Sequence, residues 1–250
     1  MVCGRLFAAV AAACLVPTAA FAQWSDNFDS YTAGSNIHGQ GGWEGWDNNS
    51  LNGGLVANSQ SLSAPNSLQD NGLSDIVHQY SGDTSGQWRY TANVFVPTTF
   101  VVPNEIAWFI LMSNYTDGGD IAGTDHWSVQ LQTTSAGVVQ DINGGTSTPT
   151  TLVRGQWVPI TVDINLGLNT RVVKYNGITI ATGTWKDASG LATANIGAVD
   201  LYANSDDVTQ GSGNTIPVFY DNLSLAPVPE PATMTALTLG VVALIRRRRK

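Results

Sequence analysis

Apolar and polar residues alternate with a period of two along much of residues 23–226. The pattern is clearest at 158–164, whose apolar members are Val158, Ile160, Val162 and Ile164. Successive side chains of a strand point to opposite faces of a sheet, so this alternation predicts a half-buried β-strand. No stretch of 12 or more residues in the segment combines helical spacing of apolar positions with freedom from glycine and proline. The pattern therefore predicts an all-β body.

Other segments add strands and a hairpin. Residues 106–112 are almost continuously apolar, which suits a central strand covered on both faces. The Asn176-Gly177 pair between two apolar runs predicts a two-residue hairpin, because these residues accept positive φ. Further strands are expected at 54–57, 76–80, 88–96, 127–133, 137–142, 196–202 and 218–225. About a dozen short strands without an internal repeat favour a two-sheet antiparallel jelly-roll sandwich over a propeller.

Residues 1–22 have the features of a secretory signal peptide. Arg5 supplies the positive charge, residues 6–16 form the apolar core, and Ala20-Phe21-Ala22 is a small-x-small cleavage site. The apolar run is too short to span about 30 Å of hydrocarbon. We therefore expect export by the general secretion machinery and a mature chain that starts at Gln23. Lipoprotein processing at Cys14 is less well supported, because alanines precede it where a large aliphatic residue is usual.

Charge is unevenly distributed along the chain. The net charge is −8 over 250 residues, but residues 23–229 hold 5 Lys or Arg against 18 Asp or Glu, a formal charge of −13. Such a body repels phosphate, which argues against nucleic-acid binding. A hydrophobic share of 43% is enough for a packed core. Both cysteines, Cys3 and Cys14, lie in the predicted signal peptide, so we expect a body without disulfides.

The C-terminal residues have three parts in a fixed order. These are the extended Val228-Pro229-Glu230-Pro231 after Pro227, an uncharged stretch at 232–245, and a basic end at 246–250. About 14 residues at roughly 1.5 Å each make a short transmembrane helix, and the cations are expected on the cytoplasmic side. This tail, 227–250, resembles the PEP-CTERM sorting signal of Gram-negative bacteria, with Val228, Pro229, Glu230 and Pro231 as its motif. A plain tail anchor with a proline-rich hinge is the alternative.

The PEP-CTERM resemblance implies a route and a partner. It implies handling by an exosortase, an inner-membrane intermediate held by the C-terminal helix, and delivery to the cell surface or extracellular polymer. Whether the helix is then cleaved or retained is left open.

Short motifs along residues 23–226 suggest a second resemblance. They are Asn27-Phe28-Asp29-Ser30-Tyr31, Gly39-Gln40-Gly41-Gly42-Trp43, Gly86-Gln87-Trp88 and Tyr220-Asp221-Asn222-Leu223. With these motifs the body resembles concanavalin A-like and laminin G-like jelly rolls. The resemblance implies the sandwich fold, which carbohydrate-binding modules and secreted surface proteins also use. A fold does not define an activity, since one architecture hosts many functions.

The loop at 39–47 is the candidate glycan site. It holds Trp43 and Trp46 beside Glu44 and Asp47. Sugar rings have apolar faces that stack on indoles and hydroxyls that bond to carboxylates. The alternative is that one or both indoles cap the sandwich. The tryptophans in or beside predicted strands are expected in the core; they are Trp88, Trp108, Trp157 and Trp185.

The last predicted strand holds an acid among apolar residues. Period two places Asp221 on the same face as Phe219, Leu223 and Leu225. A buried carboxylate must be hydrogen-bonded, paired or bound to metal. The jelly-roll resemblance implies a structural Ca²⁺ held by acids of the first and last strands, here Asp29 and Asp221, and oxygen ligands suit that ion. A carboxylate bonded to backbone N–H groups is the alternative.

The sequence lacks a convincing catalytic motif. The Glu-x-Asp-x-x-Glu strand of jelly-roll glucanases has its nearest match at Glu105, but Ala107 and Ile110 replace the later acids. His78-Gln79-Tyr80 offers part of a polysaccharide lyase set. We therefore expect a secreted, non-catalytic surface protein that binds extracellular polysaccharide. A glycan lyase or hydrolase, and a purely structural matrix protein, are the alternatives.

Overall fold

The computed structural model describes residues 23–72, 74–186, 194–205 and 214–229. The predicted signal peptide, the helix at 232–245, Glu230, Pro231 and the basic end lie outside these residues. Among the described residues, no helix has the length and hydropathy needed to cross a membrane. Helical structure in them comprises the 3₁₀ turns η1 (Trp46–Asn48) and η2 (Ser50–Asn52) and one α-helical turn, α1 (Gly119–Ala122).

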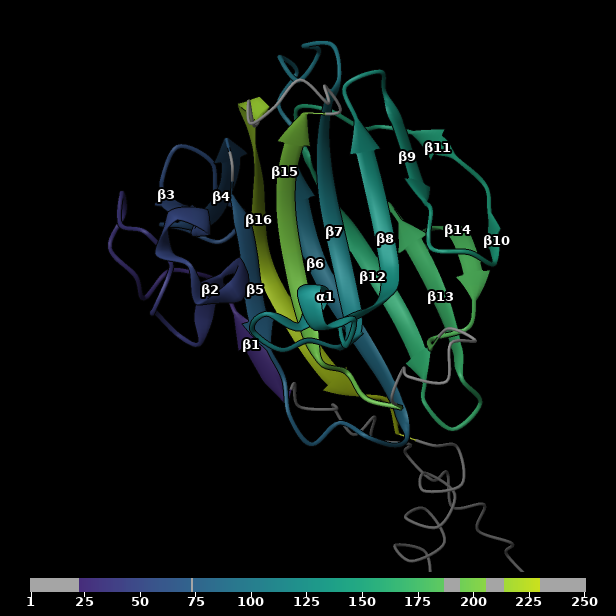
Figure 1. Ribbon diagram of the computed structural model, residues 1–250. Helices are drawn as coiled ribbons and strands as arrows, with labels where there is room; N and C mark the ends of the chain where they lie inside the picture. The colour runs from purple at the N-terminus through teal and green to yellow at the C-terminus, as the bar shows by residue number, and fades with distance from the viewer. Residues whose placement is uncertain (1–22, 73, 187–193, 206–213, 230–250) are drawn as a thin grey trace, which may run out of the picture. The chain divides into compact units, whose positions relative to one another are not determined.

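The described residues form two antiparallel sheets that lie face to face, as the sequence predicts. Figure 1 shows β15, β7 and β8 of one sheet in front of β16, β6 and β12 of the other. Sheet A has the order β10 (Thr146–Ser147), β14 (Ile178–Gly183), β13 (Thr170–Tyr175), β12 (Trp157–Asn165), β6 (Gln87–Phe95), β16 (Asn214–Pro227), β4 (Ser67–Gly72) and β3 (Leu55–Ala57), with β1 (Trp24–Asp26) also on β16. Sheet B has the order β11 (Thr150–Thr151), β9 (Val138–Asp141), β8 (His126–Thr134), β7 (Glu105–Asn114), β15 (Ala198–Ser205), β5 (Asp75–Gln79) and β2 (Trp43–Gly45).

The core lies between the sheets and follows the predicted alternation. In β12 the four apolar residues that alternate are all buried. The hairpin of β13 and β14 turns at Asn176 and Gly177, whose φ values of 49° and 78° are the positive values that its turn requires. These agreements confirm that alternation and turn chemistry specify the sandwich.

Strand β7 is covered on both faces, as its continuous apolar run predicts. Phe109 and Leu111 belong to the core between the sheets. Ile110 and Met112 point the other way and belong to a second apolar cluster, on the outer face of sheet B. Sheet B therefore has an outer face that is partly apolar.

A β-bulge in β16 moves its side chains from one face to the other. Asn222 has a left-handed backbone with φ of 50°, and the pairing of β16 with β6 is shifted beside it. Val218 and Tyr220 face the core before the bulge, and Leu223 and Leu225 face it afterwards. One extra residue in a strand reverses the parity of every later side chain.

The bulge corrects one sequence prediction. Phe219 and Asp221 do not share a face with Leu223, because strict period two fails at Asn222. Phe219 packs instead on Phe95 of β6, with ring centroids 6.3 Å apart. Asp221 therefore lies on the face of β16 away from the core between the sheets.

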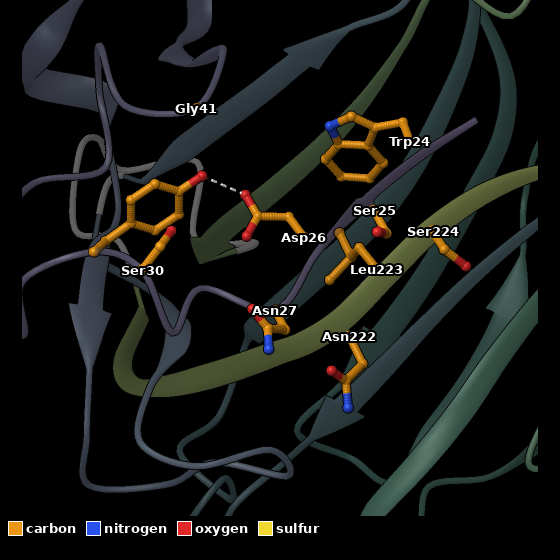
Figure 2. A pocket seen from close by; sticks show the side chains of 10 residues that line it. Trp24, Ser25, Asp26, Asn27, Ser30, Gly41, Asn222, Leu223 and Ser224 are labelled. Atoms are coloured by element: carbon orange, nitrogen blue, oxygen red, sulfur yellow. Dashed lines mark hydrogen bonds between the residues drawn. The ribbon is translucent and has the colours of Figure 1, made fainter. Parts of the chain in front are cut away.

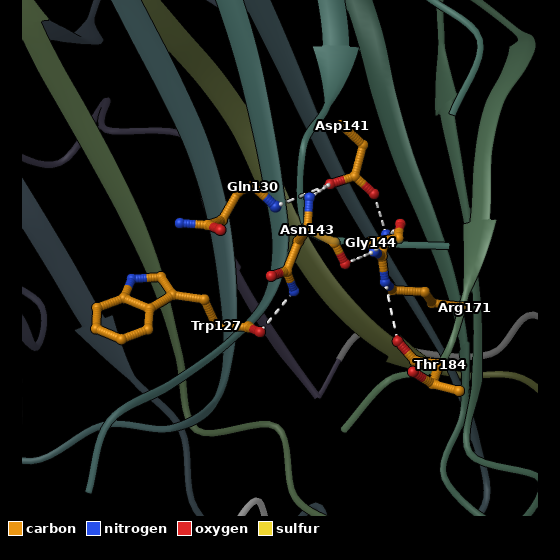
Figure 3. Close-up of polar contacts among 7 residues, drawn as sticks. All are labelled: Trp127, Gln130, Asp141, Asn143, Gly144, Arg171 and Thr184. Carbon is orange, nitrogen blue, oxygen red and sulfur yellow. Dashed lines mark hydrogen bonds and ion pairs between the residues drawn. The ribbon is translucent and has the colours of Figure 1, made fainter. Parts of the chain in front are cut away.

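One ion pair is buried where the two sheets meet. Arg171 of β13 and Asp141 of β9 bond through Nη1 and Oδ2, and both side chains have 0% exposure. The other carboxylate oxygen accepts the backbone N–H of Gln130 at 3.2 Å and of Asn143 at 3.1 Å. Figure 3 shows the guanidinium donating also to the carbonyl oxygens of Thr184 at 3.0 Å and Asn143 at 2.8 Å. This pair joins sheet A to sheet B with its polar groups satisfied.

Candidate functional site

Trp43, a predicted ligand-stacking residue, is part of the core. Its exposure is 1%, and its ring packs on Trp24 and Phe28. Its Nε1 donates to Asp26 Oδ2 at 2.9 Å. The burial pattern of β2 alternates, and Trp43 takes an inward position. The prediction that Trp43 offers a free indole face is wrong, because this short strand points it between the sheets.

A polar pocket lies beside this buried indole. Figure 2 shows residues that line it, from Trp24 of β1 to Ser224 of β16. The volume of the cavity is about 630 Å³. Asp26 at its base accepts the Tyr31 hydroxyl at 2.6 Å and the Phe28 N–H at 2.8 Å. Burial, and then the Asp26 carboxylate, raise the pKa of the Tyr31 phenol well above its usual range. The acid is thus already engaged in holding β1 to its own loop.

The other three residues of the predicted loop lie beside the outer face of sheet B. Glu44 Oε1 accepts the Gln79 side-chain amide of β5 at 2.6 Å. Asp47 Oδ1 accepts the N–H of Gly118 at 2.6 Å and so ties η1 to the loop before α1. Trp46 of η1 packs edge-on against Tyr115, with centroids 4.9 Å apart. Of the two predicted indoles, Trp46 is the one that a ligand can approach.

A groove crosses the outer face of sheet B beneath Trp46, with a cavity volume of about 390 Å³. It is lined by Trp46, Asp75, Trp108, Ile110, Trp127, Gln130, Asp200 and Tyr202, and these eight residues define what we call the aromatic groove. Strands β5, β15, β7 and β8 supply seven of them. The volume lies within the range usual for small-ligand sites, about 300–1,000 Å³.

Strand register explains why these side chains meet. Tyr202 lies opposite Asp75 on one side and Trp108 on the other. Ile110 lies between Asp200 and Gln130. Side chains at paired positions point to the same face of a sheet. Four neighbouring strands thus present a row of aromatic and polar groups to one surface.

Three tryptophans give the groove its apolar surface. The rings of Trp46 and Trp127 are parallel within 10°, with centroids 6.4 Å apart. Trp108 and Trp127 are half-buried and pack against the outer apolar cluster of sheet B. An indole face held rigidly in this way can stack against the apolar face of a ligand ring.

Two carboxyl groups form the polar side of the groove. Asp200 is 3% exposed and is hydrogen-bonded to Asp75. Burial raises the pKa of Asp200 well above its usual range, and the neighbouring carboxyl of Asp75 raises it further. Oxygen Oδ1 of Asp200 has no hydrogen-bond partner among the described residues. The wall of the groove therefore contains a buried polar atom without a hydrogen-bond partner in the described part of the chain.

Sequence reasoning missed most of this groove. It expected Trp108 and Trp157 in the core, but both are half-buried on outer faces of the sheets. Trp88 and Trp185 are buried as expected. The sequence signal for the groove is Asp200, an acid between the apolar residues Val199 and Leu201 of a predicted strand. Both neighbours are buried in the structure.

The partial lyase set does not gather at this groove. His78 is 7% exposed and packs on the rings of Trp24 and Trp43, on the core side of β5. Burial lowers the pKa of its imidazole. Tyr80 bonds to the Tyr90 hydroxyl at 2.9 Å. Gln79 is the one of the three that faces outward.

The predicted calcium ligands are engaged by hydrogen-bond donors. Asp221 Oδ2 accepts the N–H groups of Leu62 at 2.7 Å and Ser63 at 2.9 Å. Asp29 Oδ1 accepts the N–H of Asn66 at 3.0 Å. Hydrogens directed at these oxygens do not fit a bound cation, and the described residues contain no cluster of three or more acidic, histidine or cysteine ligands. The geometry favours the backbone-bonded alternative, and calcium binding stays a prediction.

Comparisons with known proteins find one kind of match for the tail and another for the body. The family model described as the PEP-CTERM protein-sorting motif matches residues 227–250. Val228 and Pro229 of this motif follow β16 directly, and the Val228 N–H donates to Gln87 O at 2.8 Å. No curated protein matches the chain by sequence.

Solved structures match the fold of the body. An endo-1,3-beta-glucanase from Streptomyces sioyaensis aligns with a TM-score of 0.56 and 14% identity, over 86% of this chain and 99% of that one. The cellulose induced protein Cip1 aligns at 0.52 and 15%, over 82% and 98%. A variant of alginate lyase Aly36B, in complex with alginate tetrasaccharide, aligns at 0.50 and 14%, over 82% and 96%. A sialidase aligns at 0.53 and 12%, but this chain spans 19% of its length. These likenesses show a concanavalin A-like sandwich.

Proposed function

We propose that this protein is exported, sorted to the cell surface or extracellular polymer by an exosortase, and binds glycan there through the aromatic groove without cleaving it. The observation that carries the binding proposal is the row of Trp46, Trp108 and Trp127 beside Asp200, whose Oδ1 has no hydrogen-bond partner in the described part of the chain. Rigid indoles and a few convergent polar groups are what a sugar site requires.

The tail supports the first half of the proposal. The PEP-CTERM motif implies export and cell-surface sorting by an exosortase. An anionic body of −13 at residues 23–229 stays in solution and avoids anionic lipid. We propose that the helix at 232–245 holds an inner-membrane intermediate, with the basic end in the cytoplasm.

The acid pair favours binding over catalysis. Glycoside hydrolases keep their two carboxyl groups about 5–9.5 Å apart, so that a sugar or a water fits between them. Asp75 and Asp200 are instead hydrogen-bonded to each other. His78, the candidate base for a lyase, lies on the core side of β5. A glycan lyase or hydrolase is the second candidate, because neighbours of similar fold include a glucanase and an alginate lyase.

The proposal is tested by glycan binding with tryptophan variants. Trp127→Ala should weaken oligosaccharide binding at least about tenfold, close to 1.4 kcal/mol, because the stacking surface is lost. Trp157→Ala is the matched control, since Trp157 is a half-buried strand tryptophan on the outer face of sheet A. Isothermal titration against a panel of oligosaccharides measures both variants.

Three results would change the assignment. Equal losses in the two variants would remove the groove as the site. No binding by the unmodified protein to any glycan would favour a purely structural matrix role. Release of reducing ends or of unsaturated uronates from the same panel would show an enzyme.

A further inference from the structure

We infer that the aromatic groove selects glycans that carry no carboxylate, sulfate or phosphate, and that it rejects polyuronates. This inference rests on the proposed function, and it names the chemistry of the ligand. It follows from the charges around the groove and from the positions of the cations.

Acidic side chains, and no Lys or Arg, line the groove in the described part of the chain. Two of the eight lining residues are acids, Asp75 and Asp200. Burial and the Asp75 carboxyl raise the pKa of Asp200, so this hydrogen-bonded pair keeps a proton and does not carry two charges. Three more acids surround Tyr115, which packs on Trp46: they are Glu44, Asp47 and Asp117. Like charges along a groove with low-dielectric walls produce a potential that repels an anionic ligand.

The cations of the body belong to other parts of the described structure. Arg171 is buried in its pair with Asp141. Arg154 donates to the carbonyl oxygens of Phe100 and Ser135, at 3.1 and 2.7 Å.

The remaining three cations belong to sheet A or its loops. Arg89 and Lys174 both bond to Asp163 on the outer face of sheet A. Lys186 follows β14, and its N–H donates to Asn169 in the loop between β12 and β13. A uronate carboxylate in the groove would therefore lose hydration without gaining an arginine or lysine partner, which is costly.

The free polar atom favours a hydroxyl-bearing ligand. Oδ1 of Asp200 is an acceptor in a residue that is 3% exposed, and no donor in the described part of the chain reaches it. An alcohol O–H can donate to this oxygen. Neutral and acidic sugars both carry such hydroxyls, so the discrimination between them rests on the acids around the groove and on the lack of a cation in its lining.

The test compares neutral and acidic oligosaccharides of equal length. The purified full-length protein is titrated with cellotetraose and laminaritetraose, and with tetramers of alginate and of galacturonate, at 10 mM and 500 mM salt. We expect a neutral tetramer to bind at least about tenfold more tightly than either acidic one at low salt. This difference in affinity should narrow at high salt, where the Debye length falls to a few ångströms.

Variants show whether the acids cause the difference. Glu44→Gln and Asp75→Asn each remove one charge near the groove and should reduce the gap between neutral and acidic tetramers by several-fold. Asp163→Asn removes the same charge on sheet A and should leave the gap unchanged.

The possible results separate the inference from the proposed function. Acidic tetramers that bind as tightly as neutral ones, with loss in Trp127→Ala, would overturn the selectivity and leave the groove as the glycan site. If Asp163→Asn changes the difference in affinity between neutral and acidic tetramers as much as Asp75→Asn does, the difference arises from the net charge of the protein. That result would also overturn the inference. If no tetramer binds, the proposed function fails and the inference fails with it.

Discussion

Two groups of acids are removed from water in this sandwich, and they are satisfied in opposite ways. Asp141 meets Arg171 and two backbone N–H groups at the junction of the sheets (Figure 3). Asp70 of β4, with 0% exposure, meets no hydrogen-bond donor among the described residues at either oxygen. The first site holds a charge by pairing it. The second holds a carboxyl group that is stable when it keeps its proton.

The second group extends from the core to the aromatic groove. Burial raises the pKa of Asp70 well above its usual range, and the charge of Asp75 raises it further. Asp75 in turn is bonded to Asp200 in the groove. The difference between the sites teaches that a buried acid without enough backbone donors, unlike Asp221, is tolerated in this fold with a cation or with a proton. The acids that keep a proton are the ones that lie next to the proposed ligand site.

The largest expected effect comes from breaking the ion pair. Arg171→Met leaves the Asp141 carboxylate buried without its cation, so the free energy of unfolding should fall by about 3–5 kcal/mol. Urea unfolding at pH 7, followed by tryptophan fluorescence, measures the loss.

The double variant Arg171→Met with Asp141→Leu is the control for this prediction. Removing both charges leaves no stranded ion, so much of the stability should return. A double variant that is as unstable as the single one would mean that the backbone bonds of the guanidinium, and not its charge, hold the sheets.

The next effect has the opposite sign. Asp70→Asn should raise the free energy of unfolding by about 1–3 kcal/mol at pH 7, because the amide needs no proton to stay neutral. The folded protein holds its Asp70 proton at pH values where the unfolded chain, with a pKa near 3.9, has released it. Stability of the unmodified protein therefore falls as pH rises above about 4, by at most about 1.4 kcal/mol per pH unit from this group.

The pH profile separates this cause from simple packing. The gain from Asp70→Asn should shrink as pH falls and disappear below about pH 3, where Asp70 is protonated in both states. Melting temperatures of the two proteins between pH 3 and pH 7 give the comparison. A gain that is constant over this range would reject the proton explanation, and a loss at pH 7 would show that Asp70 is bonded as an anion.

The sequence predicts these two groups to different degrees. Alternation identifies the strands that carry Asp141, Arg171 and Asp200, because burial on one face enforces it. The pairing of Arg171 with Asp141 is not predictable, since the two residues lie 30 positions apart on strands of different sheets. Asp70 is missed because residues 67–72 contain too little apolar alternation to indicate a strand.

The candidate site was predictable in kind but not in place. Tryptophan beside acid is the correct chemistry, and the loop at 39–47 contributes Trp46 to the groove. The sequence leaves open whether Trp43 faces a ligand or caps the sandwich, because three-residue strands are too short for their parity to be read. It predicts Trp108 in the core because alternation does not show whether the second face of a strand meets solvent, a groove or another layer.

The smallest expected effect comes from an ion pair that stays at the surface. Asp163 accepts Arg89 Nε at 2.6 Å and Lys174 Nζ at 2.8 Å, with side-chain exposures of 28%, 49% and 31%. Partial burial alone raises the pKa of Asp163, but the bonds from both cations outweigh it and lower the pKa below its usual value. The stability that this gives is present above the unfolded pKa and is lost as pH falls through the folded one.

Asp163→Asn should therefore cost less than about 1 kcal/mol at pH 7, because water screens all three groups and the long side chains lose entropy when they pair. The cost should shrink further in 0.5 M salt and at pH 3, whereas the loss in Arg171→Met should change little with salt, since its charges are shielded from solvent ions. The measurement is urea unfolding of both variants at two salt concentrations. If Asp163→Asn cost as much as Arg171→Met, ion pairs would stabilise this fold equally at the surface and in the interior. The contrast between a buried acid paired with a cation and a buried acid that keeps its proton would then lose its physical basis.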